Sequence, residues 1–75
     1  MVTKSIVVNG KVQGVFFRKS CREKAITLGI NGWVKNLPNG AVAITAMGNA
    51  AAIRDFILLC HRGPANAVVT QVMVT

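Results

Sequence analysis

The chain has 75 residues, 52% of them hydrophobic, and its nine lysines and arginines against two acidic residues set a formal net charge of +7. This length accommodates one domain, residues 1–75, and the apolar content excludes a disordered chain, while Glu23 and Asp55 are too few for catalysis by paired carboxylates. The longest apolar run, Phe56 to Cys60, is too short to span a bilayer, and Ile6 to Val8 is too short for a signal peptide, so we expect a cytoplasmic protein with no membrane partner.

The first third of the chain predicts a strand, a loop and a helix. Lys4–Asn9 is rich in β-branched residues that alternate onto one face, which is typical of a strand. Gly10 and Gly14 then mark a loop that runs to about residue 17. Arg18–Leu28 favours a helix, and Gly29 is placed to cap its end. The apolar residues at helical spacing are Cys21, Ala25 and Leu28.

The rest of the chain predicts a hairpin, a second helix and a last strand. Gly32–Asn36 and Ala41–Met47 are two strands joined by the turn sequence "LPNG". Asn49 can cap a helix that runs to about Arg62. Ala67–Val74 is again rich in β-branched residues. The second helix carries an apolar stripe made of Ile53, Phe56, Ile57 and Cys60.

This order of elements, βαββαβ, predicts an α+β fold of the ferredoxin-like type. Its antiparallel sheet has the strand order 4-1-3-2, and right-handed crossovers place both helices on one face. Cys21 and Cys60 lack the close spacing of a metal site, so we expect both to be buried apolar groups. Phe16, Phe17 and Trp33 could form a stacking surface, but we expect them to pack in the core or against the loop.

The positive charge and the glycine-containing loop both favour an anionic ligand. Charge alone does not choose among small phosphates, nucleic acid and acidic membranes, and it also suits a merely solvated surface. A loop that leads from a strand into a helix can turn its backbone N–H groups inward and cradle a phosphate. Arg18 would lie in the first helical turn, where its planar fork could hold two phosphate oxygens. On spacing alone, the loop could equally be a plain connection and Arg18 an exposed helix residue.

Two longer strings make the sequence similar to a known family. "GKVQGVFFR" at Gly10–Arg18 and "GWVKNLPNG" at Gly32–Gly40 resemble the two signature segments of the acylphosphatases. The similarity continues through "AMG" before the second helix and "GP" after it, so it covers essentially the whole chain.

The resemblance implies a ferredoxin-like fold and hydrolysis of acyl phosphates to a carboxylate and inorganic phosphate, with no metal and no cofactor. It implies that Arg18 and Asn36 are the catalytic residues, with Arg18 binding the phosphoryl group and Asn36 orienting the attacking water. The phosphate-binding residues implied in this way are Gln13, Gly14, Val15, Phe16, Phe17 and Arg18. The expected partners are a small acyl phosphate and inorganic phosphate, which is both product and competitive inhibitor.

The near absence of acids is compatible with this reaction. The leaving carboxylate has a conjugate acid with a pKa near that of Glu, about 4.3, so no general acid is needed to expel it. Alignment and neutralisation of the phosphoryl oxygens are then sufficient. The alternative function is a non-catalytic module of the same fold that binds anions or nucleic acid through its charge.

Two features depart from the family pattern. Members usually continue to a short fifth strand, which we do not find before Thr75, so the strand that carries Asn36 is expected to be an open edge that permits self-association. Positions expected to face outward are also uncharged: Val7, Ala43, Met47, Val68 and Met73.

Overall fold

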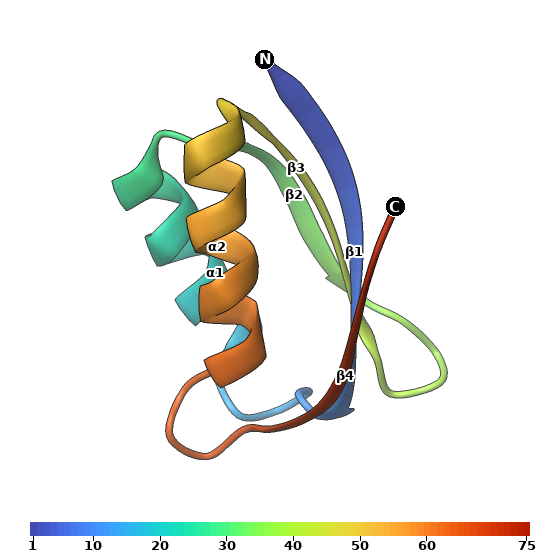
Figure 1. Ribbon diagram of the computed structural model, residues 1–75. Helices are drawn as coiled ribbons and strands as arrows, with labels where there is room; N and C mark the ends of the chain where they lie inside the picture. The colour runs from blue at the N-terminus through green and yellow to red at the C-terminus, as the bar shows by residue number, and fades with distance from the viewer.

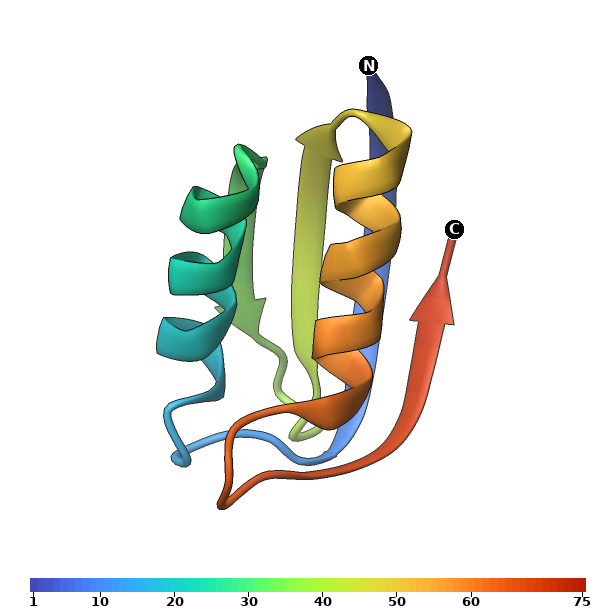
Figure 2. The ribbon, with the colours of Figure 1, turned by 60° about the vertical axis from the view of Figure 1, so that its left-hand side comes forward.

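The computed structural model describes residues 1–75 and has the predicted order of elements. The elements are β1 (Val2–Lys11), α1 (Phe17–Leu28), β2 (Asn31–Asn36), β3 (Val42–Gly48), α2 (Ala50–Arg62) and β4 (Val68–Val74). All neighbouring strands are antiparallel, in the order β2-β3-β1-β4. Both helices cover the same face of the sheet, so the molecule has two layers (Figures 1 and 2). The predicted α+β ferredoxin-like fold and strand order are therefore confirmed.

The ends of the helices follow local signals in the sequence. Helix α1 ends at Gly29, which has a φ of 71° and donates its N–H to the carbonyl groups of the last turn. Helix α2 begins after Asn49, whose side chain accepts a hydrogen bond of 2.8 Å from the N–H of Ala52. Both predicted caps are confirmed, whereas α1 begins one residue earlier than predicted, at Phe17.

The core lies between the two central strands and the helices. Ile6 and Val8 of β1 face the helices beside Ile44 of β3, and all three are buried. The predicted apolar stripes of the two helices pack against these strand residues. The buried residues of the stripes are Cys21, Ile53, Phe56 and Cys60. The core contains no buried polar or charged residue, so both cysteines behave as the predicted apolar groups. We attribute the fold's stability mainly to this apolar burial.

The face of the sheet away from the helices is uncovered and nearly uncharged. Val7 pairs with Ala43 on one side and with Met73 on the other, and all three alternate with residues that face the core. Lys35 is the one charged residue of β2 on this face, and Trp33, two positions earlier on the same strand, lies on the same side. Trp33 is 61% exposed, so the prediction that it packs in the core is wrong, because its strand position directs it to the uncovered face.

Strand β2 is an edge strand, as predicted, because it pairs only with β3. Its last residue, Asn36, pairs with buried Val42 and therefore belongs to the helix-covered face. Neither α1 nor α2 has the length and apolar content that a membrane-spanning helix needs.

Candidate functional site

Arg18 and Asn36, which lie far apart in the sequence, line one cavity of about 250 Å³. The β1–α1 loop and the β2–β3 turn lie at the same end of the sheet (Figure 2), and residues of this loop, of the start of α1 and of the end of β2 line the cavity. Its lining residues are Val12, Gly14, Phe16, Phe17, Arg18, Lys19 and Asn36. The structure therefore brings together the catalytic residues implied by the resemblance and most of the implied phosphate-binding residues.

The backbone of the loop between β1 and α1 has an unusual conformation. Gly14 and Phe16 have positive φ values of 72° and 62°, while Val15 between them does not. Phe16 is the one residue other than glycine with a positive φ, a conformation that costs a bulky side chain roughly 1–3 kcal/mol. Alternation of this kind turns successive N–H groups toward a common side and forms a concavity suited to an anion.

The N–H groups of this loop have no acceptor within the protein. From Gln13 to Lys19, no backbone N–H donates a hydrogen bond to a backbone or side-chain group of the chain. The start of α1 contributes to this set because Phe16 provides no side-chain cap and the first turn contains no acid. Helix α2, by contrast, is capped by Asn49. Free donors and the positive end of a helix dipole therefore coincide at the cavity.

Two buried side chains fasten the loop to the domain. Val12 before it and Phe17 after it are each 1% exposed and belong to the hydrophobic core. Val15 packs partly against the same core and does not line the cavity. Phe16 is 74% exposed at the rim, so the prediction that it packs is wrong, because the positive φ directs its ring outward. The loop is therefore anchored at both ends, while Gly14 and Phe16 between them face solvent.

The Gln13 side chain links the loop to the β2–β3 turn, a contact that the sequence did not predict. Its Nε2 donates hydrogen bonds of 2.8 Å to the carbonyl oxygens of both Leu37 and Ala41. The turn itself is closed by the N–H of Leu37, which donates to Ala41 O at 2.8 Å, and by the N–H of Gly40, which donates to Leu37 O at 3.2 Å. Because Leu37 follows Asn36 directly, this amide holds the end of β2 against the loop.

The charged and polar side chains of the cavity are free to meet a ligand. Arg18 and Lys19 are both exposed, and the single ion pair of the structure joins Arg54 and Asp55 elsewhere. No acidic residue lines the cavity. The Asn36 side chain makes no hydrogen bond within the chain. Lys19 was not predicted as a site residue, although its position beside Arg18 in the first helical turn could have indicated it.

Together these groups can bind a phosphoryl-sized anion with a polar amide beside it. The unpaired N–H groups supply directed donors, and Arg18 supplies a planar charged fork. Asn36 can both donate to and accept from a water molecule. Comparisons with known proteins identify the family of the chain. A family model described as "Acylphosphatase" matches residues 4–75.

Curated relatives and a solved structure carry the same family name. The acylphosphatase of Synechococcus sp. strain WH7803 is 52% identical over 87% of this chain, and that of Rubrobacter xylanophilus is 49% identical over 92%. The chain spans 65% and 63% of the length of these two relatives. The crystal structure of acylphosphatase from Bacillus subtilis matches 100% of this chain and 83% of its own, with a TM-score of 0.98 and 37% identity. Since family model, relatives and fold agree over nearly every residue, the chain belongs to the acylphosphatase family.

Proposed function

We propose that this protein hydrolyses acyl phosphates to a carboxylate and inorganic phosphate, in the cavity lined by Arg18 and Asn36. The observation that carries the proposal is the run of unpaired backbone N–H groups from Gln13 to Lys19, because most residues of this run line the same cavity as Asn36. Membership of the acylphosphatase family supports the same reaction.

In this mechanism the phosphoryl group lies in the loop. The loop N–H groups and the Arg18 guanidinium neutralise its oxygens, and their fixed directions favour the transition state over the substrate. Lys19 adds a second positive charge at the same cavity. The Arg18 guanidinium is expected to bind two oxygens at once, which a lysine cannot do.

Asn36 is assigned to the attacking water. Its amide accepts one hydrogen bond from the water and so aligns a lone pair with phosphorus, opposite the acyl oxygen. As the new P–O bond forms, the bond to the acyl oxygen breaks and its electron pair leaves with the carboxylate. The proton lost by the water passes to a phosphate oxygen, because Asn36 is not a base at neutral pH. This scheme uses no metal, so we expect hydrolysis to continue in the presence of a chelator.

Two substitutions separate the assigned roles. Arg18→Lys should weaken inhibition by phosphate and also lower kcat, because the bidentate fork is needed both to bind phosphate and to stabilise the transition state. Asn36→Ala should leave phosphate inhibition nearly unchanged and lower kcat on the order of 10²-fold or more, since only the water loses its partner. Arg22→Lys on α1 and Asn31→Ala at the other end of β2 are matched controls, because neither residue lines the cavity.

The measurements are steady-state hydrolysis and phosphate inhibition, on variants whose circular dichroism matches the parent. If Asn36→Ala hydrolyses acyl phosphates at close to the parent rate, Asn36 does not position the water.

The alternative is a non-catalytic module that binds polyanions. The exposed basic residues of α1 favour it: Arg18, Lys19, Arg22 and Lys24. Such binding would weaken steeply with salt and would not depend on Asn36. Absence of hydrolysis by the parent, together with salt-sensitive binding of nucleic acid, would favour this function over the enzyme.

A further inference from the structure

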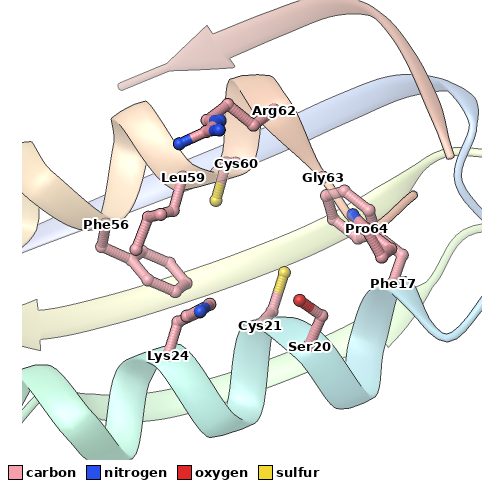
Figure 3. A pocket seen from close by; sticks show the side chains of 10 residues that line it. All are labelled: Phe17, Ser20, Cys21, Lys24, Phe56, Leu59, Cys60, Arg62, Gly63 and Pro64. Atoms are coloured by element: carbon pink, nitrogen blue, oxygen red, sulfur yellow. The ribbon is translucent and has the colours of Figure 1, made fainter.

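The two cysteines of the chain lie opposite each other between the helices. Cys21 comes from α1 and Cys60 from α2, and both are buried, at 6% and 2% exposure. Figure 3 shows their sulfur atoms pointing toward one another across the gap between the helices. The two thiols are close enough for each to shift the pKa of the other. Because the thiols face each other from two separate elements, a disulfide between them would join α1 to α2.

A small molecule can reach the pair. The thiols lie in a cavity of about 260 Å³ between α1 and α2, which also contacts the polar residues Ser20, Lys24 and Arg62. Cys21 in addition lines a second cavity of about 250 Å³ between α1 and β2. Cys21 is therefore accessible from two cavities, whereas Cys60 lines only the first.

The interaction between the thiols makes the two sulfurs unequal. Side-chain hydrogen bonding with Cys60 lowers the pKa of Cys21, even though burial raises it. The same contact, burial and the nearby charge of Cys21 all raise the pKa of Cys60 far above its ordinary range. The thiolate form, which is the reactive nucleophile, is thus favoured at Cys21.

We propose that Cys21 and Cys60 form an oxidation site for small hydroperoxides, which converts the thiol pair into a disulfide that joins α1 to α2. In the first step the Cys21 thiolate attacks one peroxide oxygen, the O–O bond breaks, and a sulfenic acid forms as hydroxide or alkoxide leaves. In the second step the Cys60 sulfur displaces the sulfenic oxygen, which leaves as water with the Cys60 proton. Overall, two thiols are oxidised to one disulfide and one peroxide is reduced to water or to water and an alcohol.

The cross-link would connect the helix that begins at the candidate site to the opposite helix. Cys21 lies one turn after Arg18, and the bridge closes a loop of about 40 residues. Closing a loop of this size restricts the unfolded chain and stabilises the folded one. We expect oxidation to raise Tm by about 10 °C or more in a domain of this size.

The test treats the purified, folded chain with excess hydrogen peroxide and then labels it with a maleimide under denaturing conditions. The expected result is a monomer that has lost two hydrogens, takes up no label, melts at a higher temperature, and returns to the starting state with a phosphine reductant. Cys21→Ser and Cys60→Ser should show no rise in Tm. Free thiols after treatment, a disulfide-linked dimer, or a stepwise gain of oxygen atoms without loss of two hydrogens would each overturn the proposal.

A second measurement identifies the attacking sulfur. In Cys60→Ser the hydroxyl still donates to Cys21 but cannot form a disulfide, so a sulfenic acid should accumulate and react with dimedone at Cys21. Cys60→Ala removes the donor and should label more slowly. Faster labelling of Cys60 in Cys21→Ser than of Cys21 in Cys60→Ser would overturn the assignment of Cys21 as the nucleophile.

Discussion

Gln13 holds the two halves of the candidate site together, so its removal is the most informative perturbation of the loop. Its Nε2 donates two hydrogen bonds of 2.8 Å, to Leu37 O and Ala41 O, across sequence separations of 24 and 28 residues. Gln13→Met keeps the size and apolar stem of the side chain and removes only the donor. The loop and the turn that follows Asn36 would then be free to move relative to each other.

The expected loss of stability depends on the hydrogen bonds that each of the two carbonyl groups retains in the variant. Leu37 O retains its bond from the N–H of Gly40, and Ala41 O retains its bond from the N–H of Leu37. Neither carbonyl is left unpaired, so the cost is that of two ordinary hydrogen bonds, roughly 1–3 kcal/mol in total. In a domain of this size that corresponds to a fall in Tm on the order of 10 °C.

The expected loss of activity is separate from the loss of stability. A displacement of Asn36 by about 1 Å relative to the loop can lower kcat by about 10²-fold, while the loop and Arg18 still bind phosphate. Thermal unfolding, kcat and phosphate inhibition should be measured on Gln13→Met well below its Tm. Gln71→Ala is the matched control, because Gln71 is exposed on β4 and makes no side-chain hydrogen bond. Parent-like stability and kcat in Gln13→Met would show that Gln13 does not hold the β2–β3 turn against the loop.

Three further outcomes are expected. Inorganic phosphate at 100 times its Kd should stabilise the folded chain by about 2.7 kcal/mol, with or without chelator, because only the folded loop binds it. Scanning calorimetry measures this effect, and an unchanged Tm would contradict the proposed phosphate site. Gly32→Ala should lower the free energy of unfolding, measured in urea, by about 3 kcal/mol or more, because the new Cβ would lie 1.8 Å from Thr45 O. Gly40→Ala has open space around the new Cβ, so it should lower the same free energy by only about 1 kcal/mol. The free edge of β2 should cause self-association that increases with protein concentration in static light scattering, and Trp33→Lys should reduce it. A parent protein that stays monomeric at millimolar concentration would show that the edge is protected.

Local chemistry explains why most of the fold could be predicted. Asn49 and Gly29 act on the nearest turn of their own helices, and "LPNG" acts within one hairpin, so each signal is complete in a short stretch of sequence. Alternation of apolar residues in β1 likewise needs only neighbouring positions to identify the buried face. Arg18 and Asn36 were found through the family resemblance, and the structure adds that they line one cavity.

The features that were not predicted depend on contacts between distant segments. The Gln13 amide has no local partner, so no spacing rule could have assigned it to the β2–β3 turn. Trp33 is exposed because the pairing of β2 with β3 sets it opposite Thr45, on the face of the sheet that no helix covers. The positive φ of Phe16 contradicts its residue type, and such violations of local preference are expected where function, rather than stability, selects the conformation.

The energetically unfavourable features of the chain are concentrated at the candidate site. Phe16 is strained, α1 lacks a cap, and the adjacent Arg18 and Lys19 are like charges without an acidic partner. The missing cap and the paired positive charges would both cost less with a bound phosphoryl group, which accepts from the free N–H groups, opposes the helix dipole and neutralises the two cations. Since Gly29 caps the end of α1, Asn49 caps the start of α2 and no buried polar side-chain atom lacks a partner, the rest of the domain supplies the stability that offsets this loop. A site organised in advance in this way has its donors in place before the substrate arrives, which is the condition for electrostatic stabilisation of a phosphoryl transition state in a protein with so few acids.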